Sequence, residues 1–328
     1  MKLPAHRGRA SRARSGEQNA GKGSFVRIVL LDPAYPAQAG GARFGPKELF
    51  DPGLIERGKV MEYKDIELIK EDRIAFITLN RPEVLNALSE TMKVELIHAL
   101  KETEEDDDIR VVILTGRGRA FCAGADLNRF VEFQKSDKDH KKKTRFGSLD
   151  LPRAFIQYPK PIIAAINGPS YGFGFTVTLT CDIRLASERA RFSCAFVRIG
   201  VTPEFCSTYF LPRLIGYSKA AEFVFTARPF DAHEALEIGA INQVFPHHRL
   251  MPEAKKMAEQ IASMPPMAVQ KSKEILRHGM QSTLEQVMQH EAMVFLDCMK
   301  SEEHQLALGK LLAQMKSREE KTRRSQKP

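Results

Sequence analysis

The sequence predicts an α/β fold built from strand, strand and helix units and followed by a region that is entirely helical. The prediction rests on two observations. Short, nearly continuous apolar runs such as 111–115 and 161–166 recur between helical segments, which is typical of sheets covered by helices. After Leu250 no strand pattern remains, and helical periodicity covers residues 251–263, 266–278, 283–300 and 303–317. A helical region of this length must pack on its own chain or on a neighbouring subunit.

The strand pattern begins just after Met61. The sequences IELIKED (66–72) and RIAFITLNRP (73–82) predict two strands joined by a tight turn, and Ser89 begins a helical pattern that reaches Asp106. The strand VVILTG (111–116), the loop RGRAFCAGADL (117–127) and a long charged segment follow. The strand PIIAAING (161–168), a glycine-rich loop, a helix over 175–180 and the strand DIRLAS (182–187) complete the pattern.

The net charge of +9 lies at the two ends of the 328-residue chain. Residues 1–60 carry +6 and residues 316–328 carry +4, which leaves −1 for the rest. Because a nucleic-acid-binding domain holds its positive charge on the folded body, we expect no nucleic-acid binding here. The longest apolar runs are far shorter than the roughly 20 residues that cross a bilayer, so we also expect no membrane span.

Composition divides the chain into four parts. We expect residues 1–60 to lie outside the fold, residues 61–250 to form the core, residues 251–317 to form the helical region and residues 318–328 to form a basic tail. The first part is rich in arginine and poor in acids, like a transit peptide, although Pro4, Gly8 and Gly16 oppose an amphipathic helix. An equally good interpretation is that the natural start is Met61.

Cysteine and histidine spacing predicts no metal site. The five cysteines are widely spaced, without a C-x-x-C pair, and are expected to be small buried hydrophobic residues in a reducing compartment. His247 and His248 are adjacent, which suits neither face of a helix for joint ligation. No secretory signal is present and the C-terminal Gln-Lys-Pro is not a peroxisomal address. We expect a cytoplasmic protein, with mitochondria or peroxisomes as alternatives.

Two loops have the composition of a site for a developing negative charge. The first, 121–127, directly follows the strand 111–115, and its small residues allow a ligand to approach the backbone. The second, 167–174, leads from a strand into a helix, where free N–H groups and the helix dipole favour anions. Side by side, the two loops would form an oxyanion hole for an acyl carbonyl. A tight turn without a ligand is an equally simple interpretation of the second loop.

A G-x-G sequence between a strand and a helix also raises the possibility of a dinucleotide fold. Two features oppose that interpretation. The first strand-to-helix junction lacks the glycine fingerprint, and no acid follows the loop at the distance that a ribose requires, since Asp182 comes too soon.

Five segments in linked order resemble the crotonase superfamily of acyl-CoA enzymes, over residues 61–250. They are LNRPEVLNALSETM, AFCAGADL, PIIAAINGPSYGFGFTVTLTCDIRLASERARF, GVTPEFCSTYFLPRLIG and ALEIGAINQVF. The resemblance implies a spiral of strand-strand-helix turns and a C-terminal helical region used for trimerisation. It also implies an acyl-CoA substrate, with coenzyme A as part of the substrate and no separate cofactor, and assembly as a homotrimer or a dimer of trimers.

The resemblance also assigns site residues. The backbone N–H groups of Ala125 and Phe173 would form the oxyanion hole, and Asn86 would lie near the pantetheine path. The residues implied to contact substrate are Ala123, Gly124, Ala125, Asp126, Leu127, Phe173 and Phe196.

The carboxylates indicate which reaction the resemblance implies. Hydratases of the superfamily hold water between two glutamates, but the matching positions here are Thr176 and Phe196, and neither side chain takes a proton from water at neutral pH. The remaining acid, Glu204, resembles the catalytic glutamate of peroxisomal-type Δ3,Δ2-enoyl-CoA isomerases. Apolar neighbours such as Phe196 and Phe205 are expected to exclude water and raise the pKa of this carboxyl.

Glu204 also has a purely structural interpretation. A Pro-Glu pair before an apolar helical run is a common helix N-terminus, with Pro203 in the first turn and the glutamate favoured by the helix dipole. Phe205 departs from the isomerase pattern, in which a glycine usually follows the glutamate. Three hypotheses remain open: an isomerase, a hydratase or another enolate-forming acyl-CoA enzyme, and an acyl-CoA-binding module without turnover whose basic ends bind partners.

Four weaker candidates each have two interpretations. Lys273 either approaches a CoA phosphate or belongs to a solvated helix face, and residues 135–145 form either a lid or a charged surface loop. Tyr171 either shapes the acyl pocket or simply packs, and Asp126 either holds its loop or touches the substrate.

Overall fold

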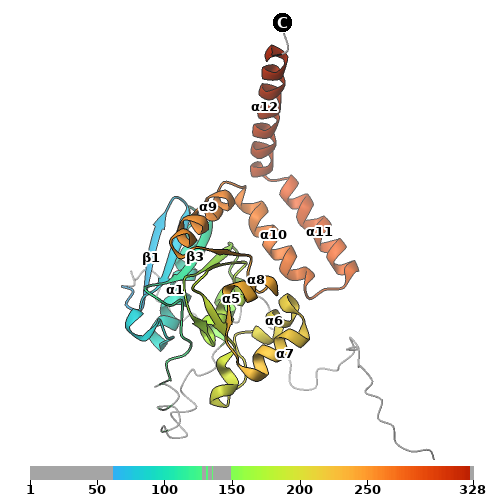
Figure 1. Ribbon diagram of the computed structural model, residues 1–328. Helices are drawn as coiled ribbons and strands as arrows, with labels where there is room; N and C mark the ends of the chain where they lie inside the picture. The colour runs from blue at the N-terminus through green and yellow to red at the C-terminus, as the bar shows by residue number, and fades with distance from the viewer. Residues whose placement is uncertain (1–61, 128–130, 132–134, 136–148, 326–328) are drawn as a thin grey trace, which may run out of the picture. The chain divides into compact units, whose positions relative to one another are not determined.

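The computed structural model describes residues 62–127, 131, 135 and 149–325, with side chains described as far as Arg318 (Figure 1). The extension predicted over 1–60 lies outside the described residues, as does the segment considered as a lid, apart from Lys135. All described residues belong to one compact unit, 52–328. Within them, none of the helices combines the length and the apolar character that crossing a membrane requires.

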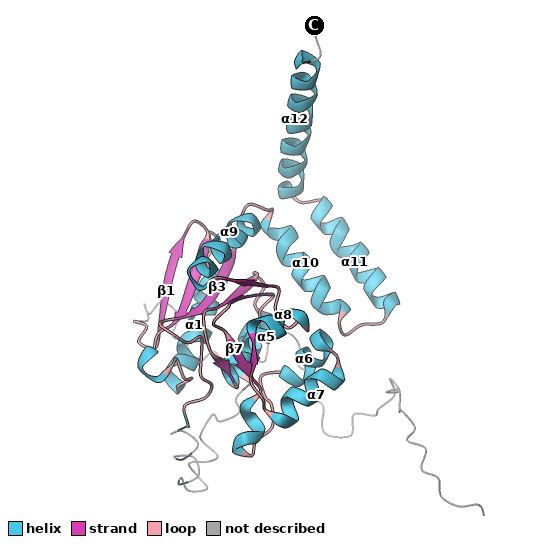
Figure 2. Cartoon of the chain, viewed as in Figure 1, coloured by secondary structure: helices cyan, strands magenta, loops and turns pink. Residues whose placement is uncertain are grey.

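The larger sheet of the described chain confirms the predicted α/β class (Figure 2). The hairpin predicted first is formed by β1 (Ile66–Glu71) and β2 (Ile74–Leu79), which pair antiparallel. The sheet then continues in parallel through β3 (Val111–Gly116), β4 (Ile162–Ile166), β6 (Ile183–Ser187) and β9 (Gln243–Phe245). A second, small sheet consists of β5 (Ser170–Tyr171), β7 (Arg191–Ser193) and β8 (Phe230–Asp231).

Helices cover both faces of the larger sheet, because its buried side chains alternate between the two faces. On one face, Ile113, Ile163 and Leu185 pack against α9 (Leu250–Ala262), which presents apolar residues at every fourth position. The residues next to these along each strand point to the other face of the sheet. There they pack in one cluster with α1 (Glu90–Glu105), α4 (Asp150–Gln157) and α5 (Phe173–Thr180).

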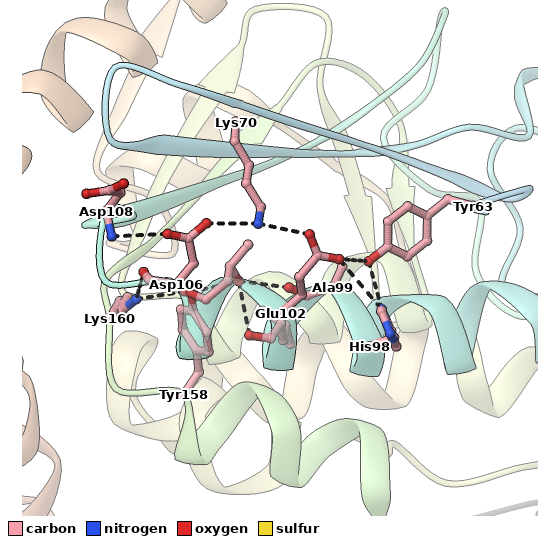
Figure 3. A network of polar contacts seen from close by, with 11 residues as sticks. Tyr63, Lys70, His98, Ala99, Glu102, Asp106, Asp108, Tyr158 and Lys160 are labelled. Carbon is pink, nitrogen blue, oxygen red and sulfur yellow. Dashed lines mark hydrogen bonds and ion pairs between the residues drawn. The ribbon is translucent and has the colours of Figure 1, made fainter. Parts of the chain in front are cut away.

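A polar network fixes α1 against β1, the residues just before β1 and the residues just before β4 (Figure 3). Lys70 pairs with Glu102 and with Asp106, each at 2.9 Å, and the Tyr63 hydroxyl donates to Glu102 at 2.8 Å. The Lys160 ammonium donates to the main-chain oxygen of Asp106 at 2.7 Å, where a carbonyl at the helix end lacks an internal partner. Burial lowers the pKa of Lys160. The predicted helix start is also confirmed: Ser89 is the N-cap of α1, and its Oγ accepts from the Met92 N–H at 2.9 Å.

The rest of the described chain is mainly helical. Short helices α6 (Ser207–Ile215), α7 (Tyr217–Thr226) and α8 (Ala232–Glu237) precede α9, and 3₁₀ turns occur at Pro82–Val84, Ala195–Ile199 and His247–Arg249. The final helices are α10 (Pro266–Gly279), α11 (Leu284–Met299) and α12 (Glu302–Ser325). Helix α12 ends at Ser325 instead of residue 317, so most of the predicted basic tail continues the helix. The reason is that its Arg, Glu and Lys residues are good helix formers.

Apolar side chains on the last helices face solvent in the single chain. Leu284, Phe295 and Leu306 are each at least 65% exposed. Large exposed apolar surfaces are typical of protein–protein contacts.

Candidate active site

The two loops that the sequence analysis considered together, 121–127 and 167–174, lie side by side. The N–H groups of Phe121 and Cys122 both donate to the carbonyl of Pro169, at 3.0 and 3.1 Å, and the Tyr171 N–H donates back to Cys122 at 2.9 Å. The first loop also pairs with the start of α1, because the Leu88 N–H donates to Gly124 at 2.8 Å. These bonds hold three segments that are far apart in the sequence in one rigid arrangement.

Glycines permit this close approach. A Cβ atom on Gly174 would lie 2.2 Å from the carbonyl oxygen of Cys122, which is far inside contact distance. Gly124 and Gly172 have φ values of +112° and +51°, which side chains with a Cβ rarely adopt. The small residues therefore bring the backbones of the two loops close to each other.

The amides of Ala125 and Phe173 lie at the ends of these loops. Phe173 is the first residue of α5, so its N–H has no acceptor within the helix. Neither N–H donates to another described residue, and both residues line the same cavity. Such donors beside a helix N-terminus favour a developing anion.

The cavity beside these amides has a volume of about 460 Å³ and mainly apolar walls. It brings together most of the residues that the sequence nominated for substrate and catalysis. Those lining it are Ala123, Gly124, Ala125, Leu127, Phe173, Phe196 and Glu204, together with Tyr171. Asp126 is not among the lining residues. Its carboxylate lies 3.5 Å from Arg81, which agrees with the interpretation that it holds the loop.

Glu204 is one of the residues that line this cavity, and it is exposed to solvent although most of the cavity wall is apolar. Burial raises the pKa of Glu204 because the charged form loses hydration. Two groups oppose that rise: the Thr176 hydroxyl, which donates to Oε1 at 3.3 Å, and the positive charge of Lys93. The carboxyl therefore combines a raised proton affinity with groups that favour its ionised form.

The chain around Glu204 contradicts its structural interpretation as a first-turn residue. Helix α6 begins at Ser207, so Pro203 and Glu204 precede it. Phe205 and Cys206 between them have φ values of +58° and +56°, a region in which glycine is unstrained and phenylalanine is not. The Phe205 ring is buried edge-on against Phe173, with ring centroids 5.2 Å apart. This burial offsets the backbone strain where the isomerase pattern has glycine.

Thr176 provides a test of the proton affinity of Glu204. Replacing Thr176 by valine removes the donor to Oε1, so the pKa of Glu204 is expected to rise further. If Glu204 works as a base, the acid limb of the kcat/KM profile then moves to higher pH, and activity below neutral pH falls several-fold. Thr178→Val is the matched control, because the Thr178 hydroxyl, on the same buried helix, donates to the main chain of Phe175. Equal pH profiles for the two variants would contradict the expectation.

Lys273 and Asn86 have structural roles that the sequence did not predict. The Lys273 ammonium donates to Asp182 and to the carbonyl of Lys160, each at 2.7 Å, and burial lowers its pKa to about 8. The lysine is therefore neither on a solvated face nor in the cavity, and it anchors α10 to the sheet. Asn86 is fully buried and donates to the carbonyl of Ala120 at 2.9 Å. This bond holds the chain in place just before the first loop.

The cysteines follow their prediction in part. Cys122, Cys181 and Cys194 are buried as expected, and burial raises the pKa of each thiol to about 12. Cys206 is exposed and Cys298 is half-buried. Among the described residues, no three side chains of the His, Cys, Asp and Glu types gather in a group that could hold a metal ion.

Sequence and structure comparisons relate this arrangement to known proteins. The family model described as enoyl-CoA hydratase/isomerase matches residues 70–319. The chain is 37% identical to a short-chain-enoyl-CoA hydratase of Clostridium acetobutylicum, an alignment that covers 78% of this chain and 97% of the relative. It is 32% identical to the peroxisomal enoyl-CoA delta isomerase 3 of Mus musculus, over 80% and 83% of the two chains. A crystal structure of an enoyl-CoA hydratase from Bacillus anthracis superposes with a TM-score of 0.71 at 33% identity. The match covers 76% of this chain and 97% of the hydratase chain.

Proposed function

The chain belongs to the enoyl-CoA hydratase/isomerase family, and from this premise we propose that it is an isomerase that moves a double bond between C3 and C2 of an acyl-CoA. The observation that supports isomerisation most strongly is the number of acids in the cavity. Glu204 is the one carboxylate among the described residues that line it. One carboxyl suffices to move a proton between two carbons, whereas the hydratase arrangement uses two to hold and divide a water molecule.

The reaction needs no group beyond those in the cavity. The Glu204 carboxylate takes a proton from C2 of a 3-enoyl thioester, and the electrons of the C–H bond form a dienolate. Its charge rests largely on the thioester oxygen, where the N–H groups of Ala125 and Phe173 would bind it. The carboxylic acid then returns the proton to C4, which leaves the double bond between C2 and C3. Apolar walls, with Phe196 and Phe205 among them, keep water from competing for the dienolate.

Hydration of an enoyl-CoA is the second candidate, and one observation favours it. Relatives named hydratases include one that is 37% identical over nearly its whole length. In that case Glu204 alone would have to activate the water and protonate C2. The third hypothesis, acyl-CoA binding without turnover, leaves the raised pKa of Glu204 without a use.

A pair of substrates distinguishes these functions. The wild-type chain is given 3-hexenoyl-CoA, with the conjugated thioester followed by absorbance, and separately crotonyl-CoA, with loss of that absorbance reporting hydration. We expect conversion of 3-hexenoyl-CoA and at least a 100-fold slower loss of crotonyl-CoA. Hydration as fast as isomerisation would overturn the proposal in favour of a hydratase. Binding of both substrates by calorimetry without turnover of either would overturn it in favour of a binding module.

We further propose that the exposed apolar side chains of α11 and α12 are covered by neighbouring subunits in a homotrimer or a dimer of trimers. Their exposure in the single chain supports this proposal.

A further inference from the structure

Phe205, the residue after Glu204, forms part of the cavity wall and is only 6% exposed. Its φ of +58° lies in the left-handed region, where a residue with a Cβ is strained and glycine is not. Such strain persists only where the surroundings hold the residue firmly, and it is frequent at functional sites. Because glycine would relieve the strain, the phenylalanine ring is the feature that needs an explanation.

Two aromatic neighbours hold the Phe205 ring in place. Its centroid lies 5.2 Å from that of Phe173, at the start of α5, with an angle of 84° between the ring planes. It lies 5.8 Å from that of Phe155, on α4, with an angle of 70°. Both are edge-to-face contacts, which are favourable at these distances. Since the ring packs against two helices, it is a fixed part of the wall.

The space behind the Phe205 ring is apolar. Phe155 is 1% exposed and is not among the residues that line the cavity, whereas Leu151, one turn earlier on α4, does line it. The Phe205 ring therefore stands between the cavity and the Phe155 ring. Without it, the cavity would extend toward α4 along buried apolar side chains, and an apolar space of this kind accepts apolar groups.

The proposed reaction determines where an acyl chain would meet this ring. The thioester oxygen would lie at the Phe173 N–H, and the Glu204 carboxyl has to reach both C2 and C4. Phe205 follows Glu204 in the chain and its ring packs against Phe173, so the carbons beyond C4 would come up against it.

We propose that Phe205 is a specificity-determining residue that limits the length of the acyl chain. Short-chain substrates such as 3-hexenoyl-CoA are then preferred to medium-chain substrates such as 3-decenoyl-CoA, because a longer chain or the packed ring would have to move. The inference rests on the isomerase function proposed above, which places C2 and C4 at Glu204.

The test is the ratio of kcat/KM for 3-decenoyl-CoA to kcat/KM for 3-hexenoyl-CoA, in which any general effect of a variant on catalysis cancels. We expect a ratio of about 0.1 or less in the wild type. Phe205→Gly removes the ring and the strain, and should raise the ratio at least about tenfold. Phe205→Leu, which keeps an apolar side chain, should raise it by a smaller factor. Phe223→Leu is the matched control and should keep the wild-type ratio, since Phe223 is fully buried on α7 and lies outside the cavity lining.

Binding of saturated acyl-CoAs tests the same wall without turnover. Each methylene that an apolar site buries strengthens binding about fourfold, so decanoyl-CoA should bind more tightly than hexanoyl-CoA wherever the longer chain has room. By calorimetry we expect no such gain in the wild type and a gain of at least about tenfold in Phe205→Gly.

The outcomes separate the inference from the proposed function. Equal kcat/KM for the two substrates in the wild type would overturn the inference. An unchanged ratio in folded Phe205→Gly and Phe205→Leu, judged by circular dichroism, would also overturn it, because the acyl chain would then run in another direction. If the wild type isomerises neither substrate, the proposed function is overturned instead, and the calorimetric gain in Phe205→Gly still decides whether the ring limits chain length.

Discussion

Glu204→Gln is expected to reduce kcat for 3-hexenoyl-CoA by roughly 100- to 10,000-fold, the usual contribution of general acid–base catalysis. Glutamine has nearly the shape of glutamate and keeps an acceptor oxygen for the Thr176 hydroxyl, so the cavity should keep its form. The glutamine side chain does not accept a proton in the working pH range, so the C2 proton of the substrate has no acceptor. KM and the affinity for a saturated acyl-CoA should change little, because the donors proposed for the enolate oxygen belong to the main chain.

A steady-state assay measures kcat and KM, and calorimetric titration with hexanoyl-CoA measures the affinity. Glu237→Gln, an exposed glutamate on α8, provides the matched control and should behave as wild type. A Glu204→Gln variant that retains more than a tenth of wild-type kcat would show that another group moves the proton. Loss of binding together with activity would instead point to a structural role for Glu204.

Gly174→Ala should have an effect of similar size through the backbone alone. The added methyl would lie 2.2 Å from the Cys122 carbonyl oxygen, so one loop must move away from the other. That movement displaces Phe173, whose N–H is one of the two donors proposed for the enolate oxygen. Loss of one such donor typically lowers kcat by about 100-fold or more. Overpacking of this kind also costs about 1–3 kcal/mol of folding free energy.

Gly279→Ala is the control for this variant. Its methyl would meet only a Val287 side-chain carbon at an ordinary 3.9 Å, so activity and melting temperature should stay close to wild type. We expect Gly174→Ala to remain folded at 20 °C with a lower melting temperature and a reduced kcat. Unchanged kcat in this variant would mean that the relative position of the two loops does not matter for catalysis.

The sequence predicted the parts of the fold that depend on residues close together in the chain. The hairpin of β1 and β2 and the helix start at Ser89 depend on residues close in sequence, and both predictions are confirmed. The near-continuous apolar runs of β3 and β4 reflect burial on both faces, which is why they predicted helix-covered strands. Strands of two residues, such as β5 and β8, are too short to show a period, so the sequence does not predict them.

The sequence predicted most of the residues that line the cavity and the direction of the pKa shift of Glu204, but it missed the polar contacts between distant residues. Loop composition and the family resemblance nominated Ala125, Phe173 and Glu204, which line one cavity. The donor from Thr176 to Glu204 joins residues 28 positions apart, and the anchor of Lys273 on Asp182 joins residues 91 apart. Such pairs form only when the chain has folded, so no local pattern contains them.

The central claim, that a single carboxyl shuttles a proton without adding water, is tested most directly in water enriched in ¹⁸O. The wild-type chain is incubated with 3-hexenoyl-CoA in this solvent, and the acyl-CoA products are identified by mass spectrometry over the first turnovers. The account predicts 2-hexenoyl-CoA that carries no ¹⁸O as the accumulating product. Accumulation of 3-hydroxyhexanoyl-CoA labelled with ¹⁸O at C3 at a comparable rate would contradict it.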